Sequence, residues 1–298
     1  MTSERRLEPE ERGRLATGRV PDACDRVLFA TDDVILGEFR CPASHPDFAS
    51  AGPINHHVVA FPREAVWIER EDSPRFVADP GVATIYNPRQ AYRRAVISAD
   101  GDRCDWIGMS EPLARGLVRG FNPADAAHNA AFRYPRATVS SDVYLAQRAL
   151  FGLARSAGAD PLDVEERALA ILAAVLGAAY GATGGGDPMP VVRDLVEHAR
   201  AAIMTRLFDN LSVGELAALV SVSPFYLCRT FRAATGSTLH AYRREMRLRT
   251  LLGIAATYRG NLSALALQAG FSSHSHFTTA FRRAFGRAPS HVGATLAS

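Results

Sequence analysis

The pattern of hydrophobic and polar positions divides the chain into a β-rich first part and a helical second part. Between residues 27 and 109, short apolar runs alternate with turn formers such as Asp79-Pro80-Gly81 and Asn87-Pro88. A series of short strands with this spacing predicts an antiparallel β-barrel or sandwich. The predicted strands cover residues 27–30, 34–39, 57–61, 66–69, 76–78, 83–86, 95–98 and 104–108.

The middle of the chain has a helical pattern. Ser140 or Ser141 can cap a helix that runs to about residue 157, and Asp160-Pro161 has the residues that begin a second one. The second helix is apolar almost all round between residues 168 and 179, so it requires a partner surface. Packing on its own sheet and a dimer interface both satisfy that need. The Gly/Pro-rich segment 181–190 is typical of a linker.

Two similar segments follow this linker. The first reads LSVGELAALVSVSPFYLCRTFRAATG and the second reads NLSALALQAGFSSHSHFTTAFRRAFG. Leu216-Ala217 matches Leu265-Ala266, and Phe231 matches Phe281 when one residue is inserted after Ser272. A repeat of about 50 residues with one apolar skeleton indicates two copies of a single supersecondary unit.

The first unit has the local chemistry of a helix-turn-helix. Ser212 and Glu215 have the spacing of a capping box, and residues 220–222 can make a tight turn. Ser223 can then cap a second helix on which Leu227 and Phe231 share one buried face. The opposite face is free to enter a major groove. It holds Phe225, Cys228, Arg229 and Arg232.

The second unit repeats this arrangement with different exposed residues. Gly270 relieves the backbone strain of its turn, and Phe277, Phe281 and Phe285 recur every four residues as a packed stripe. Hydroxyl and imidazole groups suit base edges and phosphates, and arginines suit phosphates. The residues predicted on the free face are His274, Ser275, Thr278, Thr279, Arg282 and Arg283.

A long helix is predicted between the two units. Thr238 can cap it, and at 1.5 Å per residue a helix to about residue 256 is roughly 27 Å long. Such a helix can hold two recognition helices about one DNA turn apart, on the order of 34 Å. We therefore expect two successive major-groove segments of double-stranded DNA to be read from one face.

The motifs S-P-x-x-L-x-R-x-F and G-F-S-S-x-x-x-F-x-x-x-F-R-R-x-F-G-x-x-P resemble the signature of the AraC/XylS family, and the resemblance extends over residues 191–292. It implies a sequence-specific transcription regulator, more often an activator, that works with RNA polymerase. Two features depart from the family pattern: Ser221 replaces the usual Gly of the first turn, and residues 287–292 differ from the usual ending. The residues that the resemblance places on DNA are Phe225, Cys228, Arg229, His274, Ser275, Thr278 and Thr279.

The first part also resembles a family companion. Residues 76–94 and 101–106 are similar to the cupin-like sensor half of many such regulators, which binds a small effector or forms a homodimer. We therefore expect a multidomain α+β chain with a cupin-like antiparallel β-barrel before helices and an all-α tandem helix-turn-helix domain. The expected divisions are a polar tail at 1–20, the barrel at 21–135, a helical segment at 136–180, the linker at 181–190 and the DNA-binding domain at 191–298.

Charge supports this division. All 34 basic residues are Arg, and residues 188–298 contain 13 of them with five acidic residues, whereas residues 1–187 are net acidic. A basic domain suits a polyanion. The four cysteines are scattered, the charged N-terminal segment lacks the apolar stretch of a signal peptide, and no apolar run reaches the roughly 18–20 residues of a membrane span. We expect a cytoplasmic, nucleoid-associated protein.

Other chemistry is weakly supported by the sequence. His56 and His57 suggest a metal, but neighbouring strand residues face opposite sides, and the His-x-His spacing of cupin enzymes is missing. No nucleophile triad, phosphate loop or dinucleotide motif is found, so we expect neither a cofactor nor an enzyme. Arg229 is expected on DNA in preference to a salt bridge, Cys228 as a neutral neighbour in preference to a redox switch, and His276 as a packed residue.

Two rival interpretations remain open. One is a metal cupin enzyme fused to a DNA-binding tail. The other is a constitutive DNA-binding protein whose first half only dimerises. An apolar cavity with a few polar groups would favour an effector sensor, whereas a filled barrel would favour a dimerisation module.

Overall fold

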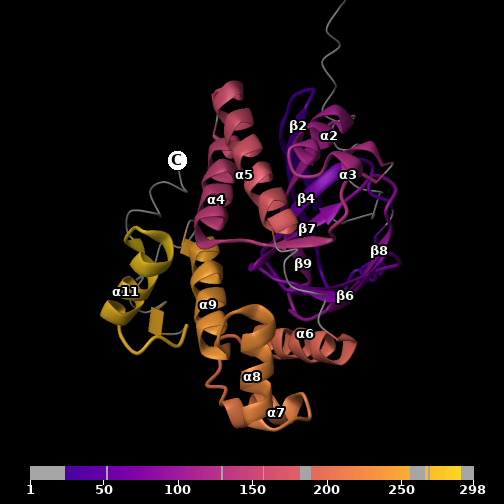
Figure 1. The fold of residues 1–298 in the computed structure, drawn as a ribbon. Coiled ribbons are helices and arrows are strands. Elements are labelled where there is room, and N and C mark those ends of the chain that lie inside the picture. The colour runs from indigo at the N-terminus through magenta and orange to yellow at the C-terminus, as the bar shows by residue number, and fades with distance from the viewer. Residues whose placement is uncertain are drawn as a thin grey trace, which may run out of the picture.

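The computed structural model describes residues 24–51, 53–128, 130–156, 158–181, 189–255, 266–267 and 269–289. Two β-sheets with covering helices make up the first half, and helices make up the second (Figure 1). The expected tail, most of the expected linker, Leu265 and the family-specific ending beyond residue 289 lie outside the described residues.

Both sheets are antiparallel throughout. The first has the order β1 (Cys24–Ala30), β2 (Val34–Cys41), β9 (Asp102–Met109), β4 (His57–Pro62), β7 (Val82–Tyr86) and β10 (Arg136–Thr138). The second has the order β3 (Ser50–Ala51), β8 (Tyr92–Val96), β5 (Val66–Arg70) and β6 (Ser73–Ala78). All eight predicted strands are found within a few residues, and the short β3 and β10 are additional.

The expected closed barrel is not found: no ladder joins the two sheets among the described residues. The chain crosses from β6 to β7 through Asp79-Pro80-Gly81. Pro80 has no N–H to give to a ladder, and the Asp79 carboxylate accepts a 2.7 Å hydrogen bond from the amide of Gly81. Because this turn uses its hydrogen bonds locally, β6 remains the edge of the second sheet, and the fold is an open sandwich.

Helices cover the outer face of the first sheet. They are α2 (Glu111–Arg119), α3 (Pro123–Ala127), α4 (Ser141–Arg155) and α5 (Pro161–Gly181). The Ser140 hydroxyl caps α4 by accepting from the amide of Val143 at 3.3 Å. Along α5, Leu172 and Val175 are buried in the core that this face shares with α4, while Leu162 is exposed. The apolar α5 therefore packs on its own sheet along one side and leaves the other side open.

The C-terminal helices are α6 (Pro190–Thr205), α7 (Val213–Leu219), α8 (Pro224–Thr235), α9 (Leu239–Ala255) and α11 (His274–Phe285). Helices α6, α7, α8 and the first part of α9 surround one core that includes Leu227 and Phe231. Helix α11 instead packs on α4, where Phe281 joins the core that contains Phe151 (Figure 1). Helix α9 has 17 residues and is therefore about 25 Å long. It lies between α11 and the group formed by α6, α7 and α8.

Candidate nucleic-acid interface

The first helix-turn-helix has the predicted caps. Ser212 and Glu215 form a complete capping box, and the Ser223 hydroxyl accepts from the amide of Tyr226 at 3.2 Å to begin α8. Between them, Ser221 has a φ of 57°, which is a left-handed conformation that favours glycine. The backbone of this turn is therefore strained at the position where the family pattern has Gly.

Helix α8 has one buried face and one exposed face, as predicted. Leu227 and Phe231 are fully buried against α6 and α9. Phe225 is 76% exposed, the largest exposed fraction of any large hydrophobic side chain in the described part of the chain. The residues that the sequence placed on the groove face, Phe225, Cys228, Arg229 and Arg232, are all exposed.

Helix α11 repeats this geometry. Ser273 caps it, and Phe277, Phe281 and Phe285 are buried with successive ring centroids 5.6 Å and 4.7 Å apart. His276, expected as a packed residue, is exposed, although its ring lies with its edge toward Phe271 at 5.6 Å. On the face predicted for DNA, Thr278 is half-buried, and His274, Ser275, Thr279, Arg282 and Arg283 are exposed.

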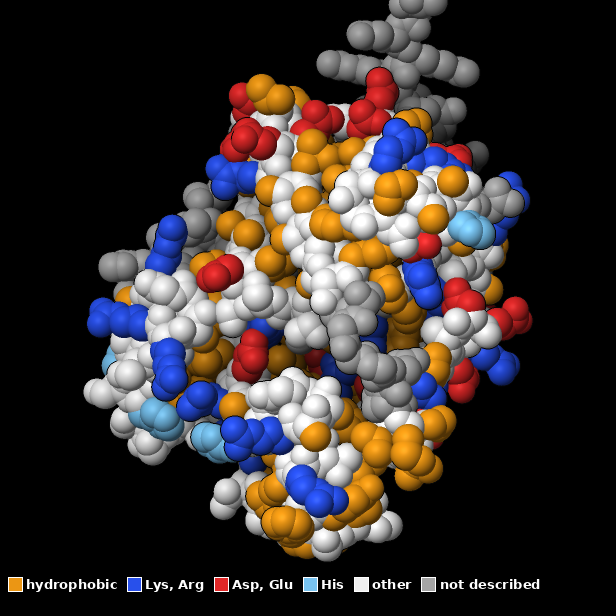
Figure 2. Space-filling model, viewed as in Figure 1, with side chains coloured by type: hydrophobic (Ala, Val, Ile, Leu, Met, Phe, Trp, Pro, Cys, Tyr) orange, Lys and Arg blue, Asp and Glu red, His pale blue; other side chains and the backbone are white. Residues whose placement is uncertain are grey.

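Helices α8 and α11 carry four exposed arginines. No ion pair among the described residues involves Arg229, Arg232, Arg282 or Arg283. Blue side chains accordingly stand out from the lower left of the molecule, over α8 and α11 (Figure 2). Since no carboxylate neutralises them, these guanidinium groups are available to phosphates and base edges.

Arg247 on α9 has a different role. Its guanidinium donates to the carbonyl oxygens of Leu207 at 2.7 Å, Asp209 at 3.0 Å and Gly270 at 3.3 Å. The first two acceptors lie between α6 and α7, and the third lies in the turn before α11. Arg247 therefore connects the two helix-turn-helix units by hydrogen bonds. The residues around Arg247 in the sequence did not predict this role.

A buried polar cluster joins the first unit to the sheets. Asp79, which is 0% exposed, accepts from Arg200 of α6 at 2.7 Å and from the hydroxyl of Tyr242 on α9. Glu197 of α6 accepts from Arg200 at 3.2 Å and pairs with Arg136 of β10 at 2.7 Å. Burial would raise the pKa of Glu197, but these two arginines hold it below its ordinary value.

Arg249 makes a second buried connection. It donates to the carbonyl oxygens of Pro80 and Val139, each at 2.6 Å, and pairs with Glu245. The hydroxyl of Tyr144 on α4 donates back to the carbonyl oxygen of Arg249 at 3.0 Å. Both connections fix α9 against the sheet domain.

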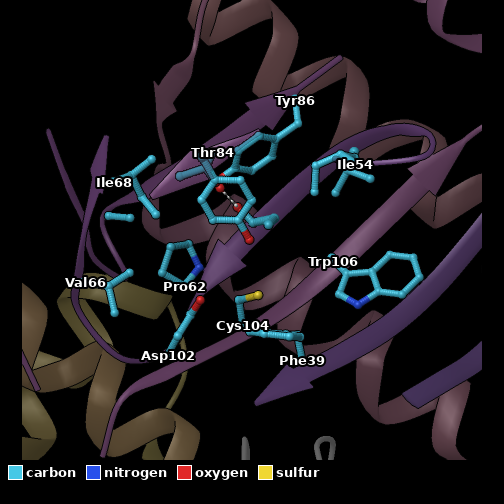
Figure 3. A pocket seen from close by; sticks show the side chains of 14 residues that line it. Phe39, Ile54, Pro62, Val66, Ile68, Thr84, Tyr86, Asp102, Cys104 and Trp106 are labelled. Atoms are coloured by element: carbon cyan, nitrogen blue, oxygen red, sulfur yellow. Dashed lines mark hydrogen bonds between the residues drawn. The ribbon is translucent and has the colours of Figure 1, made fainter. Parts of the chain in front are cut away.

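A cavity lies between the two sheets (Figure 3). Its empty volume, counted together with the open solvent at its mouth, is about 500 Å³. Apolar side chains dominate the lining, which consists of Phe39, Ile54, Val58, Ala60, Pro62, Val66, Ile68, Ala78, Thr84, Tyr86, Tyr92, Asp102, Cys104 and Trp106. No sequence signal identified this set of residues as one site.

The charge in the cavity wall is balanced. Asp102 accepts a 3.0 Å hydrogen bond from Arg94, whose buried guanidinium also lies 5.0 Å from the ring of Phe39. Burial raises the pKa of Asp102, and Arg94 opposes that rise. Because the carboxylate and the guanidinium neutralise each other, the wall offers polar contacts without a net charge.

The histidines considered for a metal lie at the start of β4, where His57 is the first strand residue and His56 directly precedes it. His57 is buried with its ring edge-on to Phe132 at 5.0 Å, and burial lowers its pKa to about 4. Over the ranges that the structure describes, no group of three His, Cys, Asp or Glu side chains is placed to hold a metal ion. None of the helices in these same ranges is long and apolar enough to cross a membrane.

Sequence comparisons show that the C-terminal part of the chain is similar to known proteins. Residues 216–294 match a family model described as a helix-turn-helix domain. Over 111 residues the chain is 32% identical to the uncharacterized HTH-type transcriptional regulator YidL of Escherichia coli (strain K12). That alignment covers 37% of this chain and 36% of the relative, so the likeness is confined to about a third of each.

Solved structures resemble this chain only with low TM-scores. An AraC-type DNA-binding domain-containing regulator from Chromobacterium violaceum is 26% identical, with a TM-score of 0.34, over 35% of this chain and 94% of that one. ToxT from Vibrio cholerae is 11% identical, with a TM-score of 0.34, over 89% of this chain and 100% of that one. Scores this low do not establish a shared fold. The likeness instead rests on sequence: residues 216–294 match a helix-turn-helix domain, and 111 residues of the chain are similar to an HTH-type transcriptional regulator.

Proposed function

We propose that this protein is a sequence-specific, effector-responsive transcription regulator that reads two successive major-groove segments of double-stranded DNA. The observation that carries the proposal is the pair of helices α8 and α11, each with a buried aliphatic or aromatic stripe and an exposed opposite face. The proposed contacts are Phe225, Cys228, Arg229, Arg232, His274, Ser275, Thr278, Thr279 and Arg282.

A binding-site selection with the purified full chain at two salt concentrations tests this proposal. We expect a motif with two blocks about one helical turn apart, and an affinity that falls with salt through the phosphate contacts. The variant Arg229→Ala should lose about 1–3 kcal/mol on the selected site. Binding without any motif, with a steep loss at high salt, would instead leave a non-specific DNA-binding protein.

The first half is proposed to be the cupin-like sensor over residues 21–135, with the helical segment at 136–180 and the DNA-binding domain at 191–298. The lining of the cavity between the sheets favours an effector sensor over a module that only dimerises, because it is mainly apolar with a few polar groups. The balanced pair of Arg94 and Asp102 suits a small effector without net charge.

The proposed coupling runs through β6. Ala78 lines the cavity, and the next residue, Asp79, accepts hydrogen bonds from α6 and α9. A bound effector that shifts β6 would therefore change the placement of the first helix-turn-helix. We further propose a homodimer through the open side of α5, an activator role with RNA polymerase, and a nucleoid-associated cytoplasmic location.

Filling the cavity mimics an effector and tests the coupling. The variant Ala60→Leu should change the affinity for the selected DNA by about fivefold or more. In an Asp79→Ala background the same filling should have a smaller effect, because the hydrogen bonds from Arg200 and Tyr242 to Asp79 are lost. An equal effect in both backgrounds would mean that the cavity does not act through this cluster. No effect in either would favour the constitutive DNA-binding protein.

A further inference from the structure

Helices α8 and α11 correspond position by position. Each has 12 residues and begins after a capping serine. Each ends at a glycine in the left-handed conformation, Gly236 with φ 70° and Gly286 with φ 69°. When the two helices are aligned in this way, Phe225 of α8 corresponds to Ser275 of α11, and Arg229 corresponds to Thr279. The groove faces of the two units therefore differ in chemistry.

Phe225 occupies the second position of α8, in the turn that enters a major groove first in a helix-turn-helix. Its ring is 76% exposed, so the free protein presents a large apolar surface to water at this point. The apolar group that base pairs offer in the major groove is the C5-methyl of thymine. An aromatic ring here therefore suits thymine better than any other base.

Arg229 lies one helical turn further along the same face. Its guanidinium carbon is 6.0 Å from the centroid of the Phe225 ring, at a cation–π distance. No ion pair among the described residues holds it elsewhere. The ring therefore guides a guanidinium whose two parallel N–H groups match the O6 and N7 acceptors that guanine presents.

Resting on the proposed function, we propose that the first unit reads a thymine beside a guanine. Phe225 covers the thymine methyl, and Arg229 donates to O6 and N7 of the neighbouring guanine. The spacing supports neighbouring bases, because 6.0 Å between ring and guanidinium spans no more than about two stacked pairs at 3.4 Å each. The second unit, with Ser275 and Thr279, lacks both groups and reads an unlike half-site.

Two base analogues test these contacts on the selected site with the full-length protein. Deoxyuridine in place of one thymine removes only the methyl group, and 7-deazaguanine in place of one guanine removes only the N7 acceptor. In fluorescence anisotropy, each replacement at the proposed step should weaken wild-type binding by about five- to tenfold. All other thymines of the first block should tolerate deoxyuridine better.

Variants that copy the residues of the second unit supply the control. Phe225→Ser should bind the thymine and deoxyuridine sites equally, and Arg229→Thr should bind the guanine and 7-deazaguanine sites equally. Both side chains are exposed, so neither change removes core packing. A base change in the second block should cost both variants as much as it costs the wild type, which shows that they are folded and engaged.

The outcomes separate this inference from the proposed function. A two-block motif whose first block is insensitive to deoxyuridine, or is equally sensitive in Phe225→Ser, overturns the thymine contact alone. The same result with 7-deazaguanine and Arg229→Thr overturns the guanine contact. If selection yields no motif, the proposed function fails with them.

Discussion

The backbone amide of Val77 donates a 2.7 Å hydrogen bond to the carboxylate of Glu197. Val77 lies on β6, the edge strand of the second sheet, and Glu197 lies on α6. An edge strand has unpaired amides that require partners, and here a helix of the C-terminal part supplies one. Ala78, the last residue of β6, lines the cavity, and Asp79 directly after it pairs with Arg200, so β6 connects the cavity with the first helix-turn-helix.

Removing the buried carboxylate of Asp79 should be costly. Asp79→Ala leaves Arg200 without its closest carboxylate, and breaking a buried pair typically costs about 3–5 kcal/mol. Urea unfolding followed by tryptophan fluorescence is suited to this test, because the ring centroid of Trp67 lies 5.2 Å from that of His198 on α6. Asp209→Ala, which breaks an exposed pair with Arg206, should cost less than about 1 kcal/mol. Equal losses would contradict a special role for the buried pair.

Arg247 should matter for the joint action of the two units. Arg247→Lys keeps the charge but lacks the planar fork that reaches three carbonyl oxygens. We expect about tenfold weaker binding to a two-block site and unchanged binding to the first block alone. Arg244→Lys on the same helix is the control, because Arg244 has no ion pair in the described part of the chain. Equal affinity losses on both kinds of DNA would refute the bridging role.

A glycine in the strained turn of the first unit should stabilise the protein. Ser221→Gly relieves a left-handed conformation and should stabilise the fold by about 1 kcal/mol in urea unfolding. The reverse change at the matching turn, Gly270→Ser, should destabilise it. There φ is 78° and an added Cβ would lie 2.7 Å from Nη1 of Arg247. Opposite signs for the two variants are the expected result, and a destabilising Ser221→Gly would show that this hydroxyl has another role.

His57 should make stability depend on pH. Its pKa is lowered to about 4 by burial, so it stays neutral in the folded chain while the unfolded chain takes up a proton near pH 6.5. The stability is therefore present above pH 6.5 and is lost as pH falls toward 4. Between pH 7.5 and pH 5 the loss should be about 2 kcal/mol. In His57→Leu that difference should shrink by the same amount, and an unchanged pH profile would assign it to other groups.

Local signals in the sequence predicted much of the fold. The strands, the Ser223 cap and the phenylalanine stripe of α11 follow from periodicity and capping chemistry, which act over a few residues. The repeat also identified the exposed faces of α8 and α11. These features depend on residues that are close together along the chain, so they can be predicted from the sequence.

Long-range features could not be predicted in the same way. Asp79 was predicted only as a turn residue, yet its partner Arg200 is 121 positions away. Glu197 and Arg200 have the spacing of an ordinary surface pair on a helix, and only the fold shows that sheet residues bury them. The choice between a barrel and a sandwich could not be made for a related reason, because strand spacing does not reveal whether β6 pairs with β7. Helices α2 and α3 between the strands and α4 were also not anticipated.

Insertion of half a helical turn between the two DNA blocks tests the central claim most directly. Two recognition helices held on one face require both blocks on the same side of the duplex, which repeats about every 10–10.5 base pairs. Adding about five base pairs should therefore reduce the affinity at least tenfold, to that of a single block. Unchanged affinity after the insertion would contradict simultaneous reading by α8 and α11.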